Sequence, residues 1–133
     1  MMDKLTQKSQ EALKAARELA RERSHQELDG AHLALALTRQ TDTIVPTLLQ
    51  RVGVDLASWE SDLNAELDRR AQVEGVSSSD VFLSRDLKQA LDRAEQEAKA
   101  LVDDYLSAEH LLLGLLECGA ALKKLFQRHD VER

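Results

Sequence analysis

The sequence has a single cysteine and no basic cluster, and each shortage excludes a class of protein. Cys118 has no partner for an internal disulfide, so the chain is not a disulfide-stapled secreted domain and fits a reducing, cytoplasmic environment. With 18 basic against 24 acidic residues, its net charge of −6 argues against binding to nucleic acids or anionic membranes. No apolar stretch reaches the length of a membrane span, and the first residues do not form a signal peptide.

Aromatic residues are scarce as well. The chain has only four of them in 133 residues, so a core has to consist mainly of Leu, Ala and Val. Mixed charged residues among Ala and Leu favour helices. The helical spacing of apolar side chains predicts an all-α fold with seven helices. They are expected over about residues 6–23, 29–40, 44–51, 55–70, 84–101, 107–116 and 120–128.

Local residue types predict where these helices begin and which faces they bury. The predicted N-caps are Thr6, Asp29, Thr43, Asp55, Ser84 and Ser107. The first helix is expected to bury one stripe, made of Leu5, Ala12, Leu13, Ala16, Leu19 and Ala20. Its charged residues, Lys14 and Arg17 among them, are expected to form a solvated surface. Residues 111–116 leave almost no polar face, which is typical of a core helix. Whether Trp59 is buried stays open.

The sequence also contains an internal repeat. Residues 5–37, shifted by 78 positions, give ten identities in 33 positions. The pair His32 and His110 and the paired caps share one continuous register, which indicates a pseudo-twofold duplication of a four-helix unit. The identical pairs are Leu5/Leu83, Ala12/Ala90, Leu13/Leu91, Ala16/Ala94, Ala20/Ala98, Leu28/Leu106, His32/His110, Leu33/Leu111, Leu35/Leu113 and Leu37/Leu115.

We expect one domain over residues 1–133. Repeat one covers about residues 3–71, a mobile linker about 72–82, and repeat two about 83–133. The second copy lacks most of its last helix. Either the domain ends early or this helix follows Arg133, and we expect the latter, because an early end would leave apolar surface uncovered.

No residue pattern predicts catalysis, a metal ion or a bound cofactor. Gly114 and Gly119 have the spacing of a phosphate-binding loop, but the lysine that completes such a loop is missing. The four histidines lack the spacing of metal ligands, and we expect His32 and His110 to bond backbone groups. Cys118 has no evident partner base and is expected to be structural.

One acidic cluster remains, made of Asp103, Asp104 and Glu109 around the start of the sixth helix. Carboxylates in such a place most simply cap a helix or keep its loop solvated. General acid–base catalysis would need two carboxylates that flank a reactive pocket, so the alternative role is binding and not catalysis.

The duplicated unit, its linker and the segment 104–113 together resemble the double Clp N-terminal repeat, over nearly the whole chain. Within that family, residues 4–13 and 72–75 make the chain most similar to the N-terminal domains of ClpB disaggregases. The resemblance implies the mobile N-terminal module of a cytoplasmic, homohexameric AAA+ ATPase. Its modules for ATP and magnesium would lie downstream, so no cofactor is expected in this domain.

The resemblance implies a domain that engages unfolded or aggregated polypeptide and helps to pass it to a central pore. The alternative is a docking domain for folded adaptor proteins, as in the ClpA- and ClpC-type unfoldases that feed a peptidase. A stand-alone helical enzyme or sensor is disfavoured, because no catalytic constellation is present.

The site residues of the family can be placed on this sequence. The resemblance maps a polar cluster onto Thr6, Asp103 and Glu109, and an apolar groove between the repeats onto Leu91. If the acidic residues lie beside Leu91, preferred clients would be apolar segments with Lys or Arg nearby.

The sequence departs from the family at three other positions. Arg93 and His110 stand where ClpB relatives can carry apolar residues, which implies a more polar groove. Ala31 replaces the acidic residue expected opposite Glu109, so only repeat two would supply that carboxylate.

Overall fold

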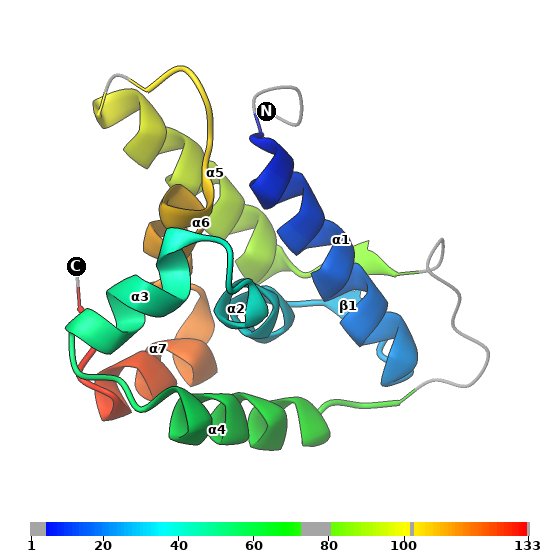
Figure 1. Cartoon of the computed structure of the whole chain (residues 1–133). Helices are drawn as coiled ribbons and strands as arrows, with labels where there is room; N and C mark the ends of the chain where they lie inside the picture. Colours follow the sequence, from blue (N-terminus) through cyan, green and yellow to red (C-terminus); the bar gives the residue numbers. More distant parts are fainter. Residues whose placement is uncertain (1–4, 73–80, 102, 133) are drawn as a thin grey trace.

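Helix α2 lies at the centre of the computed structural model, which describes residues 5–72, 81–101 and 103–132 (Figure 1). The predicted all-α fold is confirmed, and each predicted helix lies within two residues of its observed bounds. Two short strands were not predicted. The elements are α1 (Gln7–Glu22), β1 (Glu27–Leu28), α2 (Gly30–Arg39), α3 (Ile44–Arg51), α4 (Leu56–Asp68), β2 (Phe82–Leu83), α5 (Arg85–Ala100), α6 (Ala108–Leu115) and α7 (Gly119–Arg128).

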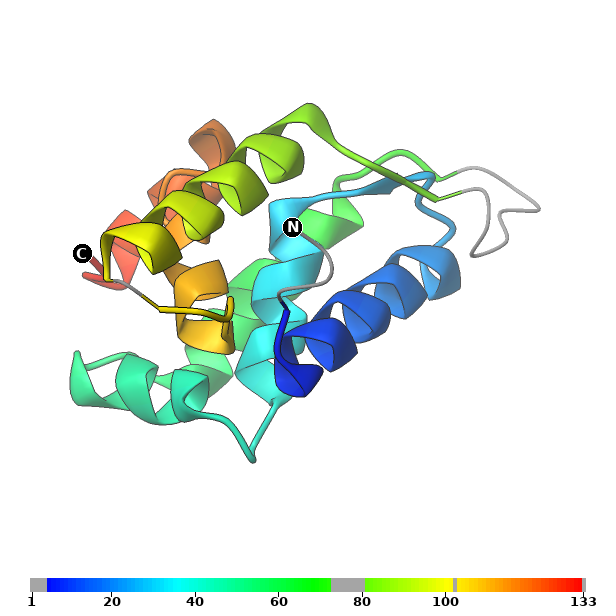
Figure 2. The ribbon, with the colours of Figure 1, turned by 90° about the horizontal axis from the view of Figure 1, so that it is seen from above.

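The central position of α2 follows from its sequence. All residues from Gly30 to Thr38 are buried, so the helix has no polar face to turn to solvent. It packs against each of the six other helices. Figure 1 shows α1 and α5 above α2 and α4 below it, and Figure 2 shows α1 and α5 on opposite sides of α2.

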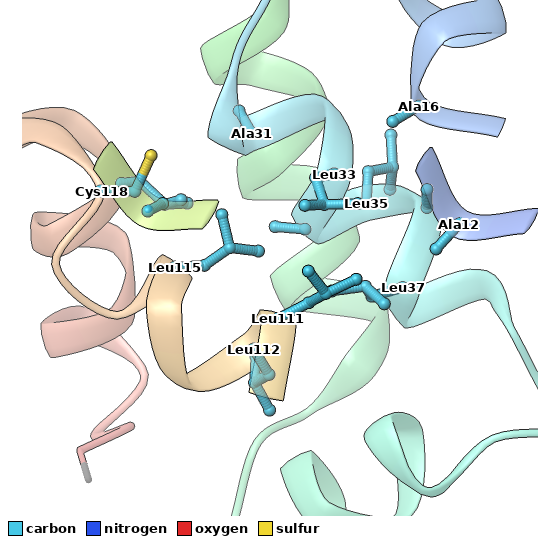
Figure 3. Close-up of a cluster of buried hydrophobic side chains, with 14 of the residues drawn as sticks. Ala12, Ala16, Ala31, Leu33, Leu35, Leu37, Leu111, Leu112, Leu115 and Cys118 are labelled. Carbon is cyan, nitrogen blue, oxygen red and sulfur yellow. The ribbon is translucent and has the colours of Figure 1, made fainter. Parts of the chain in front are cut away.

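The core between the helices consists of alanine and leucine side chains, as the scarcity of aromatic residues predicted. Ala12 and Ala16 of α1 face Leu33 and Leu37 of α2, and Leu111 of α6 approaches the same cluster (Figure 3). All five are fully buried, with exposed fractions of 0% or 1%. Small alanine side chains on α1 let its backbone lie close to α2.

The two strands form part of a seam between the copies of the repeat. Leu28 pairs with Leu83 in parallel β1 and β2, and Leu5 forms a parallel bridge with Leu106. The two pairings correspond under the shift of 78 positions. Each copy of the repeat therefore contributes one residue to each pairing. This arrangement is the one expected from a duplication.

Asp29 ties three helix ends together across this seam. Its Oδ1 accepts hydrogen bonds of 2.8 Å from the Gly30 N–H and from the Ser84 hydroxyl, at the starts of α2 and α5. Its Oδ2 lies 3.0 Å from a guanidinium nitrogen of Arg70, just after α4. The predicted cap thus also joins the two copies.

The question left open for Trp59 is settled by its position in the core. The side chain has an exposed fraction of 0%, and its indole N–H donates to the Thr38 hydroxyl at 2.9 Å. Its ring lies 4.9 Å from the ring of Phe126, between centroids. Trp59 therefore anchors α4 on α2 and α7.

Some local predictions need correction. Leu13 and Leu19 are only half-buried, because no helix covers them completely. Thr43 begins α3 but its hydroxyl donates to the Gln40 carbonyl and does not cap. Ser107 is the N-cap of α6 as predicted, in a capping box with His110, whose ring accepts the Ser107 N–H. Most of the expected linker, residues 73–80, lies outside the described residues.

Gly114 allows α5 and α6 to pack closely. A Cβ at this position would lie 2.3 Å from the backbone carbonyl oxygen of Ala90, a group that cannot move aside without shifting α5. The equivalent position in repeat one is Ala36, so the close approach is particular to repeat two.

We expect Gly114→Ala to lower the free energy of unfolding by about 2–3 kcal/mol, because the added methyl overpacks the contact between α5 and α6. Urea unfolding followed by the fluorescence of Trp59, the single tryptophan, measures this change. Ala36→Gly is the matched control and should cost about 1 kcal/mol through backbone entropy. A Gly114→Ala variant as stable as the parent would contradict the close packing.

Candidate functional site

The main candidate site is a hollow of about 370 Å³ between α1 and α5, above the paired strands. We call it the leucine groove. Four leucines and three polar residues line it, namely Gln10, Leu13, Lys14, Arg17, Leu28, Leu83 and Leu91. Figure 2 shows the two helices on either side of α2, with the strand segments joining them at one end.

The leucines of the groove come in pairs that reflect the repeat. Leu13 of α1 and Leu91 of α5 are equivalent positions, and Leu28 and Leu83 are partners in the strand pairing. Leu28 and Leu91 are buried, with exposed fractions of 1% and 4%, whereas Leu13 and Leu83 are half-buried. Sequence reasoning placed Leu91 in a groove but missed Leu13. Its equivalence with Leu91 was the signal that could have identified it.

The charged residues of the leucine groove are both cationic and both belong to α1. Arg17 donates from Nη1 to the Val81 carbonyl at 2.7 Å, which holds its guanidinium beside β2. Lys14 is exposed and forms no ion pair among the described residues. Among the residues that the structure describes, no acidic residue lines the groove.

The predicted polar cluster lies around the start of α6 instead. The Thr6 N–H donates to the Leu106 carbonyl at 3.1 Å, and its hydroxyl oxygen caps α1 by accepting the Ser9 N–H. Glu109 lies in the first turn of α6. Asp103 accepts a hydrogen bond of 2.9 Å from the His110 ring.

The structure does not bring this polar cluster into one hollow with Leu91. Thr6, Asp103 and Glu109 are absent from the lining of the leucine groove. Asp103 lines a separate, smaller hollow of about 40 Å³ that it shares with Tyr105. The acidic residues therefore do not line the same hollow as Leu91, which the expectation of basic-flanked clients had assumed.

The residues at which the sequence departs from the family also lie outside the leucine groove. Arg93 forms a 2.8 Å ion pair with Glu117 and lines a different hollow, near the end of α7. His110 is buried at the start of α6, and Ala31 is buried in α2. None of them lines the leucine groove, so its apolar surface comes from the four leucines and its polar groups come from α1.

His32 and His110 have the backbone role that was predicted for them. In each, Nδ1 accepts the N–H of the helix N-cap at 3.0 Å, from Asp29 and Ser107 respectively. An accepting Nδ1 leaves the proton on Nε2, which donates at 2.9 Å to His25 in one copy and to Asp103 in the other. These two acceptors are equivalent positions of the repeat.

Burial lowers the pKa of His32 from 6.5 to about 4, and the neighbouring His25 adds to this shift. Burial likewise lowers the pKa of His25, with Arg23 and Arg70 acting in the same direction. The buried pair is therefore neutral at pH 7.

Other candidate groups do not form a reactive site. Burial raises the pKa of the Cys118 thiol to about 12, so it is not a ready nucleophile. Gly114 lies inside α6 and not in a loop that could hold phosphate. In the part of the chain that the structure describes, no cluster of three His, Cys, Asp or Glu residues is arranged to hold a metal ion. Within the same residues, no helix combines the length and hydropathy of a membrane span.

Comparison with known proteins identifies the family of this groove-bearing fold. The family model of the Clp repeat (R) N-terminal domain matches residues 4–129. The chain belongs to the Clp N-terminal domain family. It is 40% identical over 116 residues to the chaperone protein ClpB of Nitratidesulfovibrio vulgaris, covering 86% of this chain and 13% of that protein. It is 33% identical over 134 residues to ClpB of Bacillus cereus, covering 99% and 16%.

Solved structures share the fold. The Hsp104 N-terminal domain from Candida albicans has a TM-score of 0.84 at 22% identity, covering 96% of this chain and 83% of that one. The N-terminal domain of the ClpV1 ATPase from E. coli has a TM-score of 0.79 at 25% identity, covering 92% and 77%. The chain is thus an N-domain like those of ClpB chaperones, and it spans about a sixth or less of the ClpB relatives' length.

The buried histidine pair predicts a loss of stability in acid. His32 is neutral in the folded chain down to about pH 4, whereas the unfolded chain takes up this proton near pH 6.5. The contribution of His32 to the free energy of unfolding is therefore fully present above pH 6.5. It decreases by about 3 kcal/mol as the pH falls towards 4.

His32→Gln removes the proton site and keeps an acceptor for the Asp29 N–H. We expect the free energy of unfolding to fall by about 3 kcal/mol less between pH 7 and pH 4 in this variant than in the parent. Urea unfolding at a series of pH values measures the difference, and parallel curves for the two proteins would refute it.

Proposed function

We propose that this domain is the client-binding N-terminal module of a ClpB-type AAA+ chaperone, and that it binds unfolded or aggregated polypeptide in the leucine groove. The observation that carries the proposal is the leucine groove itself, in which the half-buried Leu13 and Leu83 adjoin the buried Leu28 and Leu91 between α1 and α5. Apolar contacts are non-directional, so such a groove can accept many different sequences with modest affinity.

The similarity to ClpB chaperones supports this choice of partner. In the proposed setting, ATP and magnesium would be bound by downstream modules of a cytoplasmic homohexamer, and this domain would have no catalytic role. Nucleic acids and membranes are not expected as partners, because the net charge is −6. Docking of a folded adaptor protein is the alternative function, and it would use a surface of defined shape rather than a permissive apolar groove.

The polar cluster of Thr6, Asp103 and Glu109 is proposed as a second client contact outside the groove. Asp103 is exposed and Glu109 half-buried at the start of α6, so both can reach a bound chain. Thr6 is engaged in the seam and in the cap of α1, so its role there is mainly to position that end of the helix.

Leu13→Asp tests the groove directly. We expect about tenfold weaker binding of a fluorescently labelled, chemically unfolded model protein, because the change removes apolar contact and adds a charge. Leu19→Asp is the matched control, since it makes the same change at another half-buried position of α1 that does not line the groove. Fluorescence anisotropy measures both.

Three results would decide between the functions. Equal binding by the Leu13→Asp and Leu19→Asp variants would remove the groove from client binding. If the parent chain does not bind the unfolded protein but binds a folded partner, the adaptor function is favoured. Loss of binding in Leu13→Asp alone would support the proposal.

The polar cluster has its own test in the double variant Asp103→Asn with Glu109→Gln. Asparagine keeps an oxygen acceptor for the His110 ring, so the fold at this position is preserved while both charges are removed. We expect binding of the unfolded protein to weaken about two- to threefold at low salt. Unchanged binding would show that these carboxylates do not contact the client.

A further inference from the structure

We infer that the leucine groove prefers apolar segments that carry an acidic residue next to the apolar stretch, and that Lys14 and Arg17 provide this preference. The inference rests on the proposed client-binding function and specifies the chemistry of the client. It reverses the expectation from sequence, which placed acidic residues beside Leu91 and therefore favoured basic flanks.

The composition of the groove lining carries the inference. Beside its four leucines, the groove has one neutral polar residue, Gln10, and two cations, Lys14 and Arg17. Among residues 5–72, 81–101 and 103–132, no carboxylate lines it to neutralise them. A bound segment that places an acidic side chain beside these cations gains an ion pair, whereas a basic side chain there meets two like charges.

Both cations are available for such a contact. Lys14 is exposed and has no ion-pair partner among the described residues, unlike Lys8 on the same helix, which pairs with Asp42. Arg17 uses Nη1 to bond the Val81 carbonyl, which fixes its guanidinium in place. A guanidinium has five N–H donors, so further donors remain for a carboxylate.

The overall negative charge of the chain does not cancel this local preference. At physiological ionic strength, exposed charges more than about 8 Å apart are largely screened from each other. The carboxylate of Asp103 lines a separate hollow. At contact distance, the charges that a client side chain meets in the groove are those of its own lining.

The test uses three labelled peptides with the same apolar core and with paired Glu, Gln or Lys residues on its flanks. We expect the Glu-flanked peptide to bind about fivefold more tightly than the Lys-flanked one at physiological ionic strength, and the difference to shrink as more salt is added. Lys14→Glu should abolish or reverse this order. Lys124→Glu is the matched control, because it makes the same charge change at an exposed position on α7, away from the groove.

The outcomes separate this inference from the proposed function. A preference for the Glu-flanked peptide that is lost in Lys14→Glu and kept in Lys124→Glu supports the inference. Equal binding of all three peptides, tighter binding of the Lys-flanked one, or an order unchanged in Lys14→Glu overturns it but leaves client binding intact. If neither the peptides nor an unfolded protein binds, the proposed function itself fails.

Discussion

The need to bury α2 on every side determines the rest of the structure. Its residues from Gly30 to Thr38 have no polar face, so the six other helices have to surround it. Two of them, α1 and α5, are equivalent in the repeat and take opposite sides of it (Figure 2). Because the repeat places them symmetrically, Leu13 and Leu91 line one groove together with the paired strands, and Leu13 remains half-buried there.

The two equivalent helix starts, of α2 and α6, share a backbone bond but differ chemically. His32 and His110 make the same backbone bond, yet the second nitrogen of each ring meets a different partner. His25 gives repeat one a buried, neutral pair whose protonation costs stability. Asp103 gives repeat two an exposed carboxylate at the equivalent position. The two equivalent helix starts thus share the backbone bond and differ in the outer partner.

The sequence predicted the features that depend on neighbouring residues. It did not predict those that depend on contacts between distant segments. Helical spacing and caps such as Asp29 and Ser84 predicted every helix, because these signals act within one turn. The strands were missed because a two-residue pairing has no period and arises only when Leu28 meets Leu83. Leu13 was expected in the core, since periodicity identifies a helix face but not whether a neighbour covers it.

The charged residues of α1 also could not be assigned to a site from the sequence. In the structure, they can favour one direction of a chain bound in the groove. Lys14 reads as ordinary solvated surface in the sequence, and only the position of α5 and the strands turns it into part of a binding site. It lies eight residues after Thr6, or about 12 Å along the helix. The acidic groups around α6 lie near the Thr6 end of α1, whereas the groove cations lie from the middle of the helix onward. Leucines alone would hold a segment in either direction, so it is this separation of charge that can orient a bound chain.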